Sequence, residues 1–158
     1  QLLVCVVNVR GRITAGTAFN IKKRFDRGET NLLLGMGSFW EGADFAQQDK
    51  VIEIITRLPF DNPKDPFYQK IESLFSKQGK STFDSYSLPM MVLRFKQAIG
   101  RAQRRPEQRS AILLMDNRPL VKSYGKLFIK EVSQEVTLRH APFKQIKEDI
   151  QEFLEKEC

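Results

Sequence analysis

The chain has 158 residues, of which 41% are hydrophobic and 28% charged, as in an ordered globular domain rather than a disordered one. Its net charge of +7 favours an anionic partner such as nucleic acid, while two cysteines and one histidine are too few for a four-ligand metal site. No apolar run reaches the roughly 18 residues of a membrane span and no signal peptide is visible, so we expect no membrane contact and a cytoplasmic location.

The predicted elements alternate along the chain. Apolar runs and turn signals predict strands at 2–7, 32–35, 51–56 and 111–115, and helices at 19–25, 68–76, 119–132 and 143–155. A further long helix should start at Ser87-Leu88-Pro89 and close at Pro106. An added edge strand could lie around Glu135 to Leu138. Alternation of this kind predicts an α/β fold with a mostly parallel sheet flanked by helices.

The most informative segment is the second half of the long helix. At about 100° per residue, Gln97, Arg101 and Arg104 fall on one face, with Arg94 flanking them. Planar guanidinium groups in this arrangement suit phosphate oxygens. Taken alone, the pattern also fits an amphipathic helix whose arginines are merely solvated.

The pattern Gln-x-x-Gly-Arg-x-x-Arg resembles motif VI of superfamily 2 helicases, and other segments narrow the resemblance to the DinG/XPD-related branch. Residues 37–45, Gly-Ser-Phe-Trp-Glu-Gly-Ala-Asp-Phe, are similar to motif V of that branch. Residues 55–60, Ile-Thr-Arg-Leu-Pro-Phe, and residues 115–118, Met-Asp-Asn-Arg, follow in the family order, the latter before Tyr-Gly at 124–125. The resemblance runs from about residue 19 to residue 129.

This resemblance implies a RecA-like three-layer domain that is the second motor domain of an ATP-dependent DNA helicase moving in the 5′-to-3′ direction. The chain has no G-x-x-x-x-G-K-[ST] phosphate loop and no Asp-Glu-x-His box. ATP and Mg²⁺ would therefore be bound mainly by the first RecA-like domain of the same polypeptide. We expect residues 1–158, which start at Gln1 rather than Met, to be one domain of a longer chain, inactive by itself.

The resemblance assigns roles to four motif VI residues. Arg104 is the candidate arginine finger, and Arg101 is the second candidate for a phosphate contact. Gln97 would couple the nucleotide state to domain closure through hydrogen bonds, and Gly100 would permit close helix packing. The structural alternative is a surface helix held by salt bridges.

The motif V segment has two expected tasks. Glu41, Gly42 and Asp44 would lie by the nucleotide, where Asp44 could hydrogen-bond the ribose or a motif VI arginine. The residues expected to contact single-stranded DNA are Gly37, Ser38, Trp40 and Arg57.

Two of these segments also allow purely structural readings. Trp40, flanked by phenylalanines, could equally be a core residue. Asp116 could simply brace Arg118, and we favour that interpretation slightly.

The chain departs from the commonest family pattern in ways that suggest a divergent branch. Ala102-Gln103 replaces an aliphatic pair, and Gln108 and Ser110 stand where relatives often carry Asp and Gly. Some DinG-like proteins of this sort lack the iron–sulfur domain and carry an exonuclease domain. One alternative function is a non-enzymatic module with the same fold that holds nucleic acid or a partner protein. The other is a helicase-like regulatory or nucleic-acid-binding module attached to a 3′-5′ exonuclease, without unwinding activity.

Overall fold

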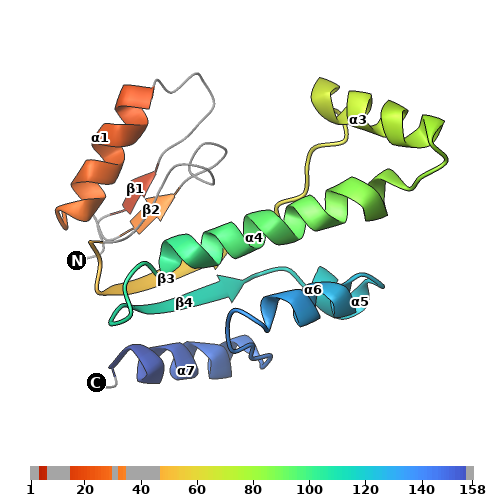
Figure 1. The fold of residues 1–158 in the computed structure, drawn as a ribbon. Helices are drawn as coiled ribbons and strands as arrows, with labels where there is room; N and C mark the ends of the chain where they lie inside the picture. Colours follow the sequence, from red (N-terminus) through yellow and green to blue (C-terminus); the bar gives the residue numbers. More distant parts are fainter. Residues whose placement is uncertain (1–3, 7–14, 30–31, 35–46, 156–158) are drawn as a thin grey trace.

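A computed structural model describes residues 4–6, 15–29, 32–34 and 47–155 of the chain. Within these ranges the helices and strands follow one another in largely the expected order (Figure 1). In chain order the elements are β1 (Val4–Val6), α1 (Ala15–Asp26), β2 (Leu32–Leu34), β3 (Lys50–Ile55), α3 (Pro66–Lys77), a π-helical turn (Phe83–Ser87), α4 (Leu88–Ala102), β4 (Arg109–Leu114), α5 (Arg118–Val121), α6 (Gly125–Val132) and α7 (Phe143–Glu155).

The described strands pair in parallel, as the alternating pattern predicts. β1 pairs with β2, and β3 pairs with β4 in the register Lys50 opposite Arg109 through Ile55 opposite Leu114. Parallel neighbours require a crossover connection, and α4 lies on the path between β3 and β4. The two strand pairs are separate in the described part of the chain, so a continuous sheet is not seen there.

The centre of the structure has three layers, with α4 on one side of β3 and β4 and α7 on the other side of β4 (Figure 1). One face of α4 packs into the main hydrophobic core, because its apolar residues recur at helical spacing. The core residues are Ile55, Leu58, Leu88, Met91, Val92, Phe95, Ala98, Ile99, Phe128 and Val132. This burial fixes which side of α4 remains available to a ligand.

α4 begins at Leu88, with Ser87 before it and Pro89 in its first turn, as the sequence predicts. A π-helical turn precedes Leu88, whose N–H donates to the carbonyl of Phe83. Pro89 has no N–H and its ring crowds the preceding turn, so a wider turn accommodates it inside a continuous helical segment. Pro89 therefore lies in the first α-helical turn, directly after the π-helical turn, which the sequence did not predict.

Residues 119–132, which we expected to form one mostly helical segment, form two short helices. α5 ends at Val121 and α6 begins at Gly125, where the Gly125 N–H donates to the carbonyl of Lys122. A Cβ on Gly125 would collide with the carbonyl oxygen of Pro119. The close approach of the two short helices therefore requires glycine at this position.

The expected edge strand around Glu135 to Leu138 is absent from this described segment. Its backbone instead makes turn hydrogen bonds, in which the N–H groups of Glu135 and Val136 both donate to the carbonyl of Val132. α7 follows as the predicted amphipathic helix. Among the described residues, no helix has the length and apolar character needed to cross a membrane.

Candidate nucleotide-facing site

The second half of α4 presents one polar face away from the core. Gln97 and Gly100 are exposed and Arg101 is half-buried, whereas the intervening Ala98 and Ile99 are buried. A Cβ on Gly100 would meet no described atom within 4 Å. The close helix packing expected at Gly100 is therefore not found in the described part of the chain, and this position leaves the helix surface open.

Arg104 does not lie on α4, which ends at Ala102 rather than continuing to Pro106. Gln103 is extended, with φ −122° and ψ 102°. In a continuing helix the Arg104 N–H would donate to Gly100, but it donates instead to Oε1 of Gln108 at 2.7 Å. The expectation of a single helical face through residue 104 is corrected, because a side-chain acceptor replaces the next helical hydrogen bond.

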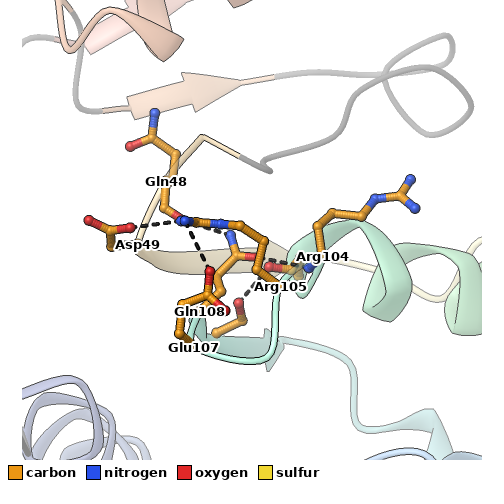
Figure 2. Close-up of polar contacts among 8 residues, drawn as sticks. Gln48, Asp49, Arg104, Arg105, Glu107 and Gln108 are labelled. Carbon is orange, nitrogen blue, oxygen red and sulfur yellow. Dashed lines mark hydrogen bonds and ion pairs between the residues drawn. The ribbon is translucent and has the colours of Figure 1, made fainter. Parts of the chain in front are cut away.

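A polar cluster fixes the turn that follows α4 (Figure 2). Nε2 of Gln108 donates to the carbonyl oxygen of Gln48 at 2.8 Å, and Nη2 of Arg105 lies 2.7 Å from Oδ1 of Asp49. Nη1 of Arg105 also lies 3.2 Å from Oε1 of Glu107. The turn is thereby joined to the segment that leads into β3.

The guanidinium group of Arg104 extends away from this cluster (Figure 2). The Arg104 side chain is exposed, and no carboxylate of the described residues lies within ion-pair distance of it. Arg105, the adjacent arginine, has two such partners. The site thus separates one arginine that fixes the turn from one whose charge is available to an anion.

The pKa of Glu53, whose carboxyl group lies on β3, is affected by burial and by the positive charge of Arg101. Glu53 lies on the same face of β3 as the buried Val51 and Ile55, where burial raises the pKa of Glu53 to about 7 although the positive charge of Arg101 lowers it. In the described part of the chain, Oε2 of Glu53 is buried without a hydrogen-bond partner. The charge near Arg101 therefore changes close to neutral pH.

An open pocket of about 420 Å³ lies at the carboxyl ends of β3 and β4. It is lined by Thr56, Arg57, Met115, Asp116, Asn117 and Arg118. Ligand clefts of parallel α/β sheets form at this edge. Arg57 is exposed there, so its guanidinium group can reach an anion.

Asp116 braces the pocket, as the structural interpretation predicted. Its carboxylate accepts hydrogen bonds from the side chain of Arg118 and, at 2.9 Å, from the backbone N–H of Leu58. Burial raises the pKa of Asp116, but these bonds and one from the Arg118 N–H outweigh it and lower the pKa to about 2. The carboxylate therefore stays ionised and links the loop after β3 to the loop after β4.

The motif V residues lie outside the described residues, and their expected roles stay predictions. They are Gly37, Ser38, Trp40, Glu41, Gly42 and Asp44.

Sequence reasoning missed two polar residues of the site. Glu53 could have been found from the alternation along β3, because the buried Val51 and Ile55 place it on the same inner face. In the sequence, Gln108 stands out only as a departure from the family pattern. Its two hydrogen bonds join residues that are distant along the chain, and no local sequence signal indicates them.

One protein family and several known proteins match this chain in sequence. The family described as "Helicase C-terminal domain" matches residues 8–135. The chain is 38% identical over 117 residues to the "3'-5' exonuclease DinG" of Bacillus subtilis (strain 168), covering 74% of the chain and 13% of the relative. It is 35% identical over 98 residues to the "ATP-dependent DNA helicase YoaA" of Escherichia coli (strain K12), covering 62% of the chain and 15% of the relative.

A third relative is the "3'-5' exonuclease DinG" of Staphylococcus aureus (strain NCTC 8325 / PS 47), 34% identical over 135 residues, or 85% of the chain and 14% of the relative. The chain thus spans about one seventh of the length of these relatives. The helicase C-terminal domain is a RecA-like α/β fold, with which the parallel strand pairs agree. The chain belongs to the helicase C-terminal domain family and is a DinG-like member of it.

Proposed function

We propose that this chain is the second motor domain of an ATP-dependent DNA helicase and that its motif VI arginines complete an ATP site from across a cleft. The observation that carries the proposal is the open polar side of α4 and the turn after it. Arg104 is exposed there without an ion-pair partner among the described residues, while the opposite side of α4 is buried. The relative named an ATP-dependent DNA helicase supports this function.

Phosphoryl transfer depends mainly on positioning and on stabilising the charge that develops on the phosphate oxygens. Arg104 would reach the γ-phosphate as the arginine finger, and Arg101 would make a second phosphate contact. Gln97 would report the nucleotide state to the domain interface through hydrogen bonds. The bare backbone at Gly100 would leave room for the nucleotide or the facing domain on the same side of α4.

The groups on this face suit phosphate rather than a divalent cation. Guanidinium and amide groups donate hydrogen bonds to phosphate oxygens, whereas Mg²⁺ takes oxygen ligands such as carboxylates. No cluster of three or more potential metal ligands occurs among the described residues. ATP and Mg²⁺ would accordingly be held mainly by the first RecA-like domain of the same polypeptide, with Glu41, Gly42 and Asp44 completing the nucleotide contacts from this chain.

Single-stranded DNA is the proposed nucleic-acid partner. Arg57 is exposed at the pocket between the carboxyl ends of β3 and β4, where it can contact a phosphate. Gly37, Ser38 and Trp40 would add backbone, hydroxyl and aromatic contacts. The net charge of +7 favours such a partner.

A second candidate function is a regulatory module of a 3′-5′ exonuclease that does not unwind DNA. The names of the Bacillus subtilis and Staphylococcus aureus relatives favour it. Arginine contacts to the ATP phosphates are compatible with both candidate functions, which differ in the process that ATP hydrolysis drives. ATP hydrolysis would drive strand separation in the first and would alter only cleavage in the second.

The test is DNA-stimulated ATP hydrolysis by the complete polypeptide that carries this domain, wild type against Arg104→Ala. Loss of an arginine finger should lower turnover by about 10³-fold or more, because the transition-state charge loses its partner. The matched control is Arg139→Ala, which removes an exposed arginine whose ion pair with Asp149 lies away from α4. The control should retain turnover.

Unchanged turnover in folded Arg104→Ala would show that this arginine does not act on the nucleotide. Strand-separation and nuclease assays of the same wild-type sample distinguish the two candidate functions. ATP-dependent unwinding supports the helicase. Cleavage that ATP modulates, without unwinding, supports the exonuclease module.

A further inference from the structure

Arg104 must be fixed by something other than helix geometry, because it lies two residues beyond the end of α4. Gln103 is extended, so the α-helical hydrogen-bond ladder does not hold the Arg104 backbone. A long side chain can place its guanidinium group reproducibly only if its own backbone is fixed. A displacement of about 1 Å in a catalytic group can reduce turnover by about 10²-fold.

The side chain of Gln108 makes the hydrogen bond that fixes the backbone of Arg104. Gln108 is a polar residue with only 3% of its surface exposed. Its Oε1 accepts from the Arg104 N–H at 2.7 Å, and its Nε2 donates to the Gln48 carbonyl at 2.8 Å. The backbone partners require oxygen at one end of the amide and nitrogen at the other, so the amide orientation is fixed.

The other contacts of the turn are weaker candidates for this task. In the Arg105–Asp49 ion pair the Asp49 side chain is 87% exposed, and ion pairs with such exposure stabilise a structure only weakly. Ser110 donates to the carbonyl of Ala102 and so satisfies the end of α4 rather than Arg104. Gln108 is the buried group that contacts the Arg104 backbone directly.

The hydrogen bond from Gln108 to Gln48 also connects two segments that are distant along the chain. Gln48 lies shortly after Asp44 in the sequence and directly precedes Asp49. The carbonyl of Asp49 accepts the Arg109 N–H. The Gln108 amide thus joins the motif VI turn to the segment that directly follows motif V (Figure 2).

We infer that Gln108 is a positioning residue for Arg104, holding the arginine finger at the distance that turnover requires. The inference rests on the proposed function of Arg104.

The experiment measures kcat and KM for ATP in the complete polypeptide at saturating DNA, with Gln108→Leu made in both the wild-type and the Arg104→Ala backgrounds. Leucine has a similar size but neither hydrogen-bonding group. In the wild-type background kcat should fall by about 10²-fold while KM changes little, because the contact to the transition state is lost. In the Arg104→Ala background the same change should have almost no further effect on kcat.

Gln151→Leu is the matched control, since it removes an exposed glutamine bond to Glu155 on α7. It should leave kcat unchanged. An equal loss from Gln108→Leu in both backgrounds would show a merely structural role and overturn the inference. Unchanged kcat in Gln108→Leu would also overturn it, while a large effect of Arg104→Ala would still support the proposed function.

Gln108→Glu keeps the test decisive if Gln108→Leu does not fold. A protonated glutamic acid can accept from the Arg104 N–H and donate to the Gln48 carbonyl, whereas the ionised form has no donor. The kcat of folded Gln108→Glu should therefore decline with rising pH relative to wild type. A profile parallel to that of wild type would contradict the positioning role.

Discussion

At the scale of single residues, Glu53 and Asp116 show how the surroundings of a carboxyl group set its charge. Asp116 accepts several hydrogen bonds, and its pKa falls to about 2. For Glu53, burial raises the pKa to about 7 and the charge of Arg101 only partly opposes the shift. Of these two carboxyl groups, only that of Glu53 therefore changes its charge close to neutral pH.

Glu53→Gln should remove a pH-dependent contribution to stability. The folded pKa of about 7 lies above the ordinary value of 4.5, so folding favours the protonated acid. That stability is fully present below pH 4.5 and is lost as the pH rises through 7. The neutral variant should match wild type near pH 4.5 and be more stable at pH 8, as measured by urea unfolding.

The matched control for this prediction is Glu72→Gln, at an exposed position in α3. The difference in unfolding free energy between this control and wild type should depend much less on pH. If the Glu53→Gln difference were the same at pH 5 and pH 8, the ionisation of Glu53 would not be linked to folding.

At the scale of elements, two helical glycines have opposite surroundings. A Cβ on Gly125 would collide with the Pro119 backbone between α5 and α6, whereas a Cβ on Gly100 would meet no described atom within 4 Å. The neighbour at Gly125 is a carbonyl group, which cannot rotate away as a flexible side chain can. One glycine is thus required by packing, and the other lies on the open polar side of α4.

Gly125→Ala should destabilise the chain by about 1–3 kcal/mol or more, because α5 and α6 must separate to admit the methyl group. The matched comparison is Gly100→Ala, which should stabilise α4 by up to about 1 kcal/mol through better helix propensity. Urea unfolding of the two variants measures both effects. Equal effects of the same sign would contradict the packing difference.

At the scale of the whole molecule, the positive net charge should make the affinity for single-stranded DNA depend on salt. The net charge is +7, and Arg57 is exposed at the carboxyl edge of β3 and β4. Phosphate contacts release counterions, so affinity for single-stranded DNA should fall steeply as salt is raised. Association through apolar contacts would have little such dependence.

Arg57→Ala should weaken binding of a labelled single-stranded oligonucleotide and reduce the slope of log affinity against log salt by about 0.7, the contribution of one phosphate contact. Fluorescence anisotropy at several salt concentrations measures it. Arg139→Ala, with its ion pair to Asp149, is the control for loss of one positive charge elsewhere. Equal slopes for wild type and Arg57→Ala would exclude a phosphate contact at Arg57.

Most of the described elements could be predicted from local patterns, because apolar periodicity reflects which face is buried. The helix at 143–155 is found as α7 with the predicted bounds. The strand at 51–56 and the helix at 68–76 are found as β3 and α3, with ends shifted by one or two residues. Predictions failed where distant groups intervene. The predicted helix at 119–132 is divided where the Pro119 carbonyl lies against Gly125. α4 ends at Ala102, and Gln108 then accepts the Arg104 N–H in place of a helical carbonyl.

The sequence by itself determined the α/β class, the family and which arginines are candidates for a phosphate contact, because periodicity and motifs are written in consecutive residues. The tertiary structure decided which of the two adjacent arginines after α4 has its charge available to an anion. Arg105 is held by Asp49 and Glu107, while Arg104 extends outward from a turn fixed by Gln108 and Gln48. These partners are up to 60 residues apart along the chain, so only folding brings their hydrogen-bonding groups together.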